Sequence, residues 1–336
     1  QQGDDKLATI SDVAKLSGLS VSTVSRVINN KPHVSEAKRQ RVQEAMDALG
    51  YSPLQAARQM RGSGSGNVAV VVPTITNNFF AHLVDSIERT CSKYAYRTLI
   101  IQTYGERAGE EEALNLLRMQ HADGAILCAI ENQWELIRKF TQYGRLVACN
   151  EYNEDHEISM ICGRQYEGFQ KATEYLLGKG HQRIAYCTGP KGLNIDSDRY
   201  RGFIETLSKA GKSADPDQMF TRIHTMEDGK RVMKKILNLS LQERPDAVIA
   251  GSDEVAAGMV IEGLANGIRI PEDIAILGVD DQPLASCIQI PLTTIRQPIA
   301  QEGEYAAKEM IRQLRDGAED TIRKELDLEL VIRQSA

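Results

Sequence analysis

The chain has 336 residues and a formal net charge of −6. At roughly 100–200 residues per domain, this length predicts two or three domains. Hydrophobic residues make up 42% of the sequence and charged residues 26%, which is typical of a globular protein and excludes a wholly disordered chain. No segment approaches the ~18 apolar residues of a membrane helix, and the six cysteines lack metal-site or disulfide spacing. We therefore expect a cytoplasmic protein with reduced thiols and no membrane partner.

The charge is unevenly distributed along the chain. Residues 6–61 contain nine basic and four acidic residues, so this segment carries +5 and the remainder −11. A small basic module attached to a larger acidic body predicts a local binding site for nucleic-acid phosphates.

Three short helices are predicted in the basic module. Their expected N-caps are Ser11, Ser20 and Ser35. Gly18 begins a three-residue turn between the first two helices, and left-handed geometry at Asn29 and Asn30 is expected to end the second. Two helices around so short a turn predict a helix-turn-helix.

The second of these helices carries side chains that suit the DNA major groove, where the N-terminal residues of a helix face base edges. Arg26 could bind guanine O6 and N7, Ser22 is a short hydrogen-bonding group, and Val21 could contact a thymine methyl. Thr23 lies among them. The alternative is a helical hairpin that packs on another partner, with Arg26 as a solvated charge. The basic balance and the N-terminal position favour DNA binding.

Residues 54–61 could form one or two helical turns, followed by a Gly/Ser linker at 62–66. A helix this short is marginal in water, so we expect it to form only when something holds it. The glycines precede a strand instead of following one, which favours a linker over a phosphate-binding loop.

From residue 67 onward, apolar runs alternate with amphipathic segments, a pattern that predicts parallel strands covered by helices on both faces. About 270 residues are many for one such unit, so we expect two doubly wound lobes, with a ligand cleft at the carboxyl ends of the strands. The expected strands are 68–72, 98–101, 124–127, 146–149, 184–186, 247–250 and 274–279, and the expected helices are 79–94, 110–119, 166–178, 199–210, 228–239, 254–265 and 300–315.

Two acidic pairs, 253–254 and 280–281, each follow an expected strand. Such carboxylates could be catalytic, bind a metal, accept hydrogen bonds from sugar hydroxyls, or cap the next helix. Capping suits Asp253, which follows Ser252, better than Asp280. No catalytic motif accompanies either pair, so we do not expect an enzyme. Arg199, expected at a helix start where the dipole disfavours a cation, is either solvated or a cleft residue that orients a hydroxylated or anionic ligand.

At these residues the sequence resembles the lactose/galactose repressor (LacI/GalR) family of bacterial transcription regulators. The resemblance covers residues 7–333 and is most specific at 9–14 and 21–29. Further matching segments are 34–36, 49–53, 78–80, 179–184, 199–203, 252–253, 278–281 and 291–298.

The resemblance implies a homodimer bound to a near-palindromic operator in double-stranded DNA, with paired hinge helices in the central minor groove. Where the family usually inserts a leucine wedge this chain has Met60, whose apolar side chain can also insert between bases. Ala57, one turn earlier, suits a close approach to DNA. The DNA contacts that the resemblance implies are Thr9, Ser20, Val21, Ser22, Thr23, Arg26, Asn29, Val34, Ser35, Tyr51, Ala57 and Met60.

The resemblance also implies a small-molecule effector, a sugar or a sugar phosphate, with no metal and no other cofactor. Arg164 and Gln165 stand where many relatives have Asp-Asn. This reversal of charge could indicate an anionic ligand or a rebuilt salt bridge where the chain crosses between lobes, and we favour the salt bridge. The implied ligand contacts are Thr74, Asn77, Phe79, Asn150, Arg199, His224, Ser252, Asp253 and Asp280.

The predicted fold is therefore an α/β two-lobed, periplasmic-binding-protein-like core with an N-terminal all-α helix-turn-helix domain. We expect a ligand-responsive, sequence-specific repressor of bacterial carbohydrate-metabolism genes. The alternative is a sugar-binding protein with the same two lobes and no role in transcription. The expected boundaries are 7–53 for the headpiece, 54–66 for hinge helix and linker, and 67–333 for the core, with one lobe at about 67–163 and 297–323 and the other at about 164–296 and 324–333.

Overall fold

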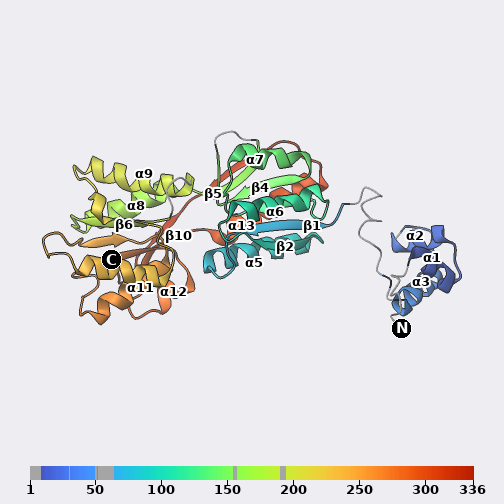
Figure 1. Ribbon diagram of the computed structural model, residues 1–336, viewed down its shortest axis with the longest axis horizontal. Coiled ribbons are helices and arrows are strands. Elements are labelled where there is room, and N and C mark those ends of the chain that lie inside the picture. Colours follow the sequence, from blue (N-terminus) through green and yellow to red (C-terminus); the bar gives the residue numbers. More distant parts are fainter. Residues whose placement is uncertain (1–8, 30, 50, 52–63, 154–156, 190–193) are drawn as a thin grey trace. The chain divides into compact units, whose positions relative to one another are not determined.

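The computed structural model describes residues 9–29, 31–49, 51, 64–153, 157–189 and 194–336. The chain divides into two compact units, Gln1–Ser65 and Gly66–Ala336 (Figure 1). The expected hinge helix at 54–61, with Ala57 and Met60, lies outside the described residues.

The first unit contains the expected helix-turn-helix. Its helices are α1 (Ile10–Ser17), α2 (Val21–Ile28) and α3 (Glu36–Ala48). They enclose a small apolar core of Val13, Ala14, Val24, Val42, Ala45 and Tyr51.

The ends of these helices differ from expectation at two places. Helix α1 is capped by Thr9 and not by Ser11, because Thr9 and Asp12 form a reciprocal capping box. Ser20 caps α2 as predicted, and Gly18 has the left-handed geometry that ends α1. The left-handed geometry expected at the end of α2 is wrong for Asn29, whose φ is −92° and whose side-chain Nδ2 donates to the Ser25 carbonyl at 2.5 Å. Asn30 lies outside the described residues.

The second unit is built on two six-stranded sheets, and the first defines the N-lobe. Its strands lie in the order β11-β5-β4-β3-β1-β2, and all pairs are parallel. The strands are β1 (Asn67–Val72), β2 (Arg97–Gln102), β3 (Gly124–Leu127), β4 (Arg145–Cys149), β5 (Ser159–Gly163) and β11 (Arg323–Leu326).

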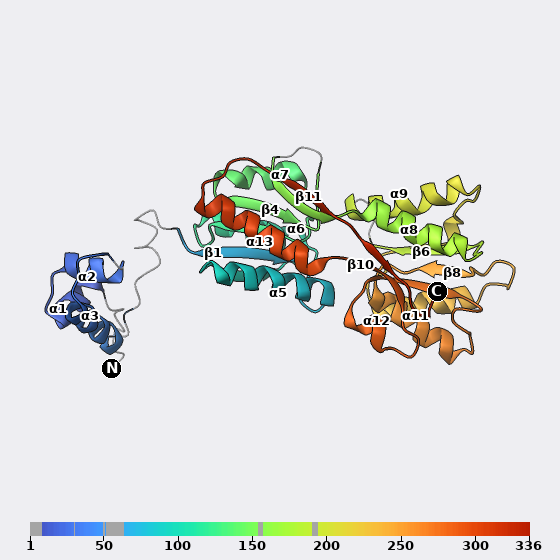
Figure 2. The ribbon, with the colours of Figure 1, turned by 180° about the vertical axis from the view of Figure 1, so that it is seen from behind.

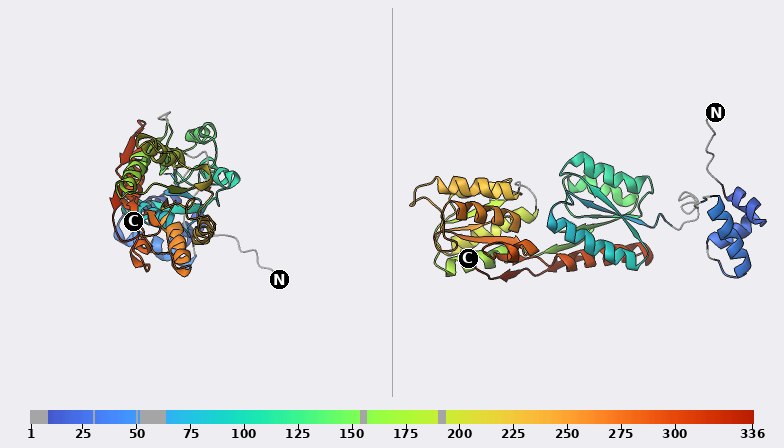
Figure 3. Two further views of the ribbon diagram at one scale, coloured as in Figure 1. Left: turned by 90° about the vertical axis from the view of Figure 1, so that its left-hand side faces the viewer. Right: turned by 90° about the horizontal axis from the view of Figure 1, so that it is seen from below.

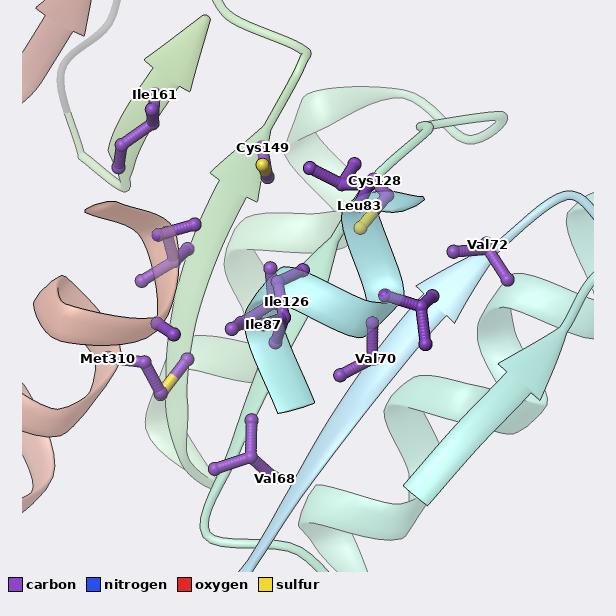
Figure 4. Close-up of a cluster of buried hydrophobic side chains, with 14 of the residues drawn as sticks. Val68, Val70, Val72, Leu83, Ile87, Ile126, Cys128, Cys149, Ile161 and Met310 are labelled. Atoms are coloured by element: carbon purple, nitrogen blue, oxygen red, sulfur yellow. The ribbon is translucent and has the colours of Figure 1, made fainter. Parts of the chain in front are cut away.

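Helices cover both faces of the N-lobe sheet, which explains why its central strands are mostly apolar. Helices α5 (Asn78–Lys93) and α13 (Ile299–Arg315) lie side by side on one face (Figure 2). Their side chains pack on β1, β3 and β4 in the cluster shown in Figure 4. Helices α6 (Arg107–Arg118) and α7 (Trp134–Arg138) cover the other face.

The second sheet defines the C-lobe, with strand order β12-β10-β9-β8-β6-β7. Only β12 runs antiparallel to its neighbour. The strands are β6 (Ile184–Thr188), β7 (Met219–Thr221), β8 (Ala247–Ile249), β9 (Ala275–Asp280), β10 (Thr293–Arg296) and β12 (Glu329–Val331). Its helices are α8 (Gln165–Gly178), α9 (Asn194–Lys209), α10 (Met226–Leu237), α11 (Asp253–Ala265) and α12 (Pro283–Cys287). Figure 3 shows helices on both sides of each sheet.

The chain passes between the two lobes three times, at residues 163–165, 296–299 and 326–329. The third passage lies later than the expected boundary at 323/324, because Arg323–Leu326 forms an edge strand that pairs with β5. Helix α9 also differs from expectation. It begins at Asn194, so Arg199 is one turn inside the helix and the expected conflict with the helix dipole does not arise.

The described ranges show neither a membrane-spanning helix nor a cluster of metal-binding side chains. None of the helices found there is both long and apolar enough to span a membrane. The same residues contain no group of three or more His, Cys, Asp or Glu side chains arranged to hold a metal ion.

Candidate functional site

Helix α2 presents three exposed side chains, of which Ser22 Oγ lies within hydrogen-bond distance of Ser20 Oγ at 2.9 Å. Val21 is 44% exposed, and Ser22 and Arg26 are exposed as well, whereas Val24 on the opposite face is buried in the headpiece core. Ser22 and Arg26 lie one turn apart and so share a face. The Arg26 side chain makes no hydrogen bond or ion pair with any described residue, which leaves its guanidinium available for a partner outside the chain.

The other residues predicted to contact DNA have varied environments. Ser20 Oγ accepts a hydrogen bond from the Thr23 amide at 3.2 Å, so these two side chains fix the start of α2. Thr9 and Ser35 are exposed at the starts of helices, whereas Val34 and Asn29 are half-buried. The structure places Tyr51 in the headpiece core, where it is only 9% exposed, so its ring supports the fold of the headpiece.

The second unit contains a cavity of about 540 Å³ between the lobes. Its walls come from segments that follow the carboxyl ends of parallel strands, where ligands bind in this architecture. Eight of the nine predicted ligand residues line it: Thr74, Asn77, Phe79, Asn150, Arg199, His224, Ser252 and Asp280. The structure thus brings them together, and their contact with a ligand stays a prediction.

Asp253 is the exception, and the expectation that it lines the cleft is wrong. Its side chain is fully buried and turned into the C-lobe, where Oδ1 accepts from Thr294 Oγ1 at 2.6 Å and Oδ2 accepts from the Gln282 amide at 2.7 Å. Burial and the charge of Asp280 raise the pKa of Asp253 to about 8. Asp253 therefore ties the start of α11 to β10 and to the segment after β9.

The second acidic pair is also divided between two roles. Asp281 is held by Arg296 Nε at 2.7 Å and by Arg333 NH2 at 2.5 Å, whereas Asp280 faces the cavity. Burial raises the pKa of Asp280. Asp280 and Asn150 adopt φ values of 102° and 63°, in the region that L side chains rarely occupy. Such strain is concentrated at functional sites.

A chain of hydrogen bonds joins the cavity wall to two of the interlobe crossings. Arg199 Nε donates to Gln165 Oε1 at 2.8 Å, and Gln165 Nε2 donates to Gln297 Oε1 at 2.7 Å. Gln297 Nε2 in turn donates to Asp280 Oδ1 at 2.6 Å. Gln165 and Gln297 are buried, at 1% and 4% exposure. The crossings at 163–165 and 296–299 are thus linked through the same groups that line the cavity.

Arg164 lies outside the cavity and forms a salt bridge at the crossings. Its Nε is 3.4 Å from Glu325 Oε2 and its NH1 is 3.0 Å from Asp327 Oδ1. Of the two interpretations of the reversed charge, the structure shows the rebuilt salt bridge. The neighbouring Gln165 is the buried member of the hydrogen-bond chain described above.

Several residues of the cavity wall were not predicted from the sequence: Tyr104, Glu131, Glu151, Asp196 and Gln297. Three of them, Tyr104, Glu131 and Glu151, could have been found from their position, because each follows shortly after an expected strand of the N-lobe. Burial, followed by the charges of Asp196 and Glu131, raises the pKa of Glu151 to about 8.

Both units match known protein families. Residues 9–53 match the family described as bacterial regulatory proteins, lacI family, and residues 173–336 match the periplasmic binding protein-like domain. The NTD biosynthesis operon regulator NtdR of Bacillus subtilis is 33% identical over 330 residues, covering 98% of this chain and 100% of that protein. The ribose operon repressor of Halalkalibacterium halodurans is 32% identical, covering 98% and 97%.

A solved structure supports the same assignment. A LacI regulator from Lactobacillus casei with bound Tris is 34% identical with a TM-score of 0.75, covering 81% of this chain and 98% of that chain. Further structures of that regulator hold glucose or sucrose. The helix-turn-helix, the two-lobed core and the identity along nearly the whole chain lead to one conclusion: the protein belongs to the LacI family of DNA-binding transcriptional regulators.

Proposed function

We propose that this protein is a cytoplasmic, homodimeric repressor. Its two headpieces read the half-sites of a near-palindromic operator, and a polyhydroxylated small molecule in the cleft changes its affinity for that operator. A relative named as an operon repressor supports the sign of regulation. The glucose, sucrose and Tris found in the L. casei regulator support a hydroxyl-rich ligand.

The observation that carries the ligand response is the hydrogen-bond chain from Arg199 through Gln165 and Gln297 to Asp280. A ligand bound to Arg199 and Asp280 contacts the same side chains that link two interlobe crossings. Its contacts therefore differ between arrangements of the lobes, and a ligand can shift a conformational equilibrium only through such a difference.

Two other functions fit the molecule less well. A sugar-binding protein without a role in transcription leaves α2 and its exposed Arg26 unexplained. An enzyme built on the two acidic pairs would need them to act together, but only Asp280 enters the cavity while Asp253 and Asp281 are held by other side chains. We therefore assign the cleft to binding without a chemical step.

The test is selection of an operator from random double-stranded DNA by the full-length protein, followed by titration at several salt concentrations. Because phosphate neutralisation releases counterions, the logarithm of affinity should fall steeply and linearly with the logarithm of salt concentration. Repeating the titration with glucose, sucrose and other polyols tests the ligand response. A protein that enriches no sequence would refute the proposal, and so would operator affinity that no polyol alters.

A further inference from the structure

The interlobe cavity has an excess of negative charge. Four carboxylates line it, and Arg199 is the only lysine or arginine that lines it among the described residues. When all five side chains are ionised, the described part of the cavity wall therefore carries −3, with His224 as a further titratable group. The carboxylates come from four separate segments, namely the loop after β3, the residues after β4, helix α9 and the end of β9: Glu131, Glu151, Asp196 and Asp280.

Arg199 does not neutralise these groups by direct contact. Its Nε donates to Gln165 Oε1, and its guanidinium carbon lies 5.3 Å from the centre of the Phe169 ring. Within the described part of the chain it forms no ion pair with a carboxylate. It acts on the cavity through its field, and this field lowers the pKa of Glu151 by less than burial raises it.

Glu151 is the least exposed of the four carboxylates. It is only 5% exposed, it lines the cavity, and it has no hydrogen bond or ion pair with any described residue. The preceding residue, Asn150, is 9% exposed, and its buried Oδ1 also has no hydrogen-bond partner. Two adjacent residues after β4 thus offer unpartnered oxygen atoms at the cavity wall. A buried acceptor without a partner, such as Asn150 Oδ1, is costly, so a ligand that donates to it offsets that cost.

The chemistry of the possible donors distinguishes the ligand classes. A neutral hydroxyl supplies one donor and no charge, whereas an ammonium group supplies three N–H donors and one positive charge. A phosphate group would add negative charge to a described wall that has four acidic side chains and one arginine. Hydrogen bonds between an ammonium and a carboxylate are about twice as strong as those between neutral groups.

We infer that the cleft binds a polyhydroxylated primary amine of the amino-sugar class. The ammonium group contacts Glu151 and Asn150, and the hydroxyls contact Asp280 and Arg199. This inference rests on the proposed function, because it names the ligand class of the same cleft.

The protonation of Glu151 gives the binding reaction a second signature. The charged groups that act on Glu151 are Asp196, Glu131 and Glu110, which raise its pKa, and Arg199, which lowers it. With its pKa raised to about 8, Glu151 is largely protonated at neutral pH without ligand. A bound ammonium stabilises the carboxylate, so binding releases a proton. The affinity for the amine then rises with pH up to about 8, as long as the amine itself stays protonated.

The experiment is calorimetric titration of the full-length protein, in buffers free of primary amines, with matched pairs of probes. The pairs are glucosamine and glucose, galactosamine and galactose, mannosamine and mannose, and Tris and pentaerythritol, with glucose 6-phosphate as the anionic probe. We expect at least one amine to bind about tenfold tighter than its neutral partner, with heat that depends on the ionisation enthalpy of the buffer. The inference is overturned if every neutral partner binds as tightly as its amine, if glucose 6-phosphate binds tightest, or if no amine binds at millimolar concentration.

Variants locate the ammonium site. Glu151→Gln should reduce the preference for the amine over its neutral partner by about tenfold, because the amide cannot form the charged hydrogen bond. Glu111→Gln, an exposed position on α6, is the matched control and should keep the preference unchanged. Thermal melting verifies that both variants fold. A Glu151→Gln protein that keeps the full preference would overturn the assignment of Glu151.

Operator titration separates this inference from the proposed function. A neutral sugar that binds tightest and changes operator affinity would refute the inference of an amine ligand but would still support a ligand-responsive repressor. An amine that binds tightly without changing operator affinity would support the assigned ligand class and refute the proposed response.

Discussion

Replacing Glu302 with glutamine should change how the stability of the N-lobe depends on pH. Glu302 lies in the first turn of α13, is fully buried, and neither of its carboxylate oxygens has a hydrogen-bond partner among the described residues. Burial raises the pKa of Glu302 from 4.5 to about 8, with the Asp280 charge adding to the shift and Arg199 opposing it. The folded protein therefore resists ionisation of a group that ionises readily in the unfolded chain.

The sign and the size of the effect follow from this difference. Below pH 4.5 the carboxyl group is protonated in both states and the shift has no effect on stability. Between pH 4.5 and about 8 only the unfolded state loses the proton, so the free energy of unfolding falls by about 1.4 kcal/mol per pH unit. Above pH 8 the penalty is constant. Glutamine cannot ionise, so Glu302→Gln should gain roughly 3–4 kcal/mol relative to wild type between pH 5 and pH 8.

Urea unfolding followed by tryptophan fluorescence measures this gain in the relevant lobe. Trp134 is the single tryptophan of the chain and lies on α7 of the N-lobe. The difference between the two unfolding midpoints should widen by roughly 1–3 M urea from pH 5 to pH 8. Glu304→Gln is the control, because Glu304 lies on the same helix but its side chain is 46% exposed and paired with Lys308. Parallel pH profiles for wild type and Glu302→Gln would refute the reasoning, whatever their constant offset.

The elements that could be predicted from the sequence are those whose burial requires a recognisable run of apolar residues. Strand β1 lies in the interior of its sheet and is covered on both faces, so its residues form a continuous apolar run. Strands β11 and β12 were not predicted, because they are short edge strands with charged residues such as Lys324 and Glu329. Strand β5 was missed for another reason. It begins with buried Ser159, whose Oγ donates to Glu309 Oε1 at 2.7 Å, so a polar contact replaces apolar packing there.

The residues of the cleft could also be predicted only in part. The family resemblance identified residues that face the cavity, but it did not show the direction of each side chain. Asp253 begins α11 directly after its N-cap Ser252, and this position turns its carboxylate towards Thr294 and away from the cavity. The negative charge at Glu151 and Asp196 was not predicted, because these residues are distant in the sequence and only the tertiary fold brings them to one cavity.

Three further variants test the DNA-reading helix, the crossing salt bridge and the hydrogen-bond chain. Arg26→Ala should weaken binding to the selected operator by about 1–3 kcal/mol and relax one base position; equal losses on operator and random DNA would show that Arg26 contacts only phosphate. Arg164→Ala should lower stability by less than about 1 kcal/mol, because this salt bridge is exposed. It should leave ligand affinity unchanged. A large loss of affinity for an anionic ligand would instead support the interpretation that Arg164 binds such a ligand. Gln297→Leu should have the largest effect, because it removes the acceptor of Gln165 Nε2 and the donor to Asp280 Oδ1, leaving two buried polar groups without those partners. At about 1–3 kcal/mol for each orphaned group, its thermal midpoint should fall by several degrees. The ligand should also shift operator affinity less in this variant, since the link between cleft and crossings is broken. Gln301→Leu, an exposed change on α13, is the matched control. A Gln297→Leu protein with the melting point and the ligand response of this control would show that the hydrogen-bond chain neither stabilises the core nor couples the cleft to the lobes.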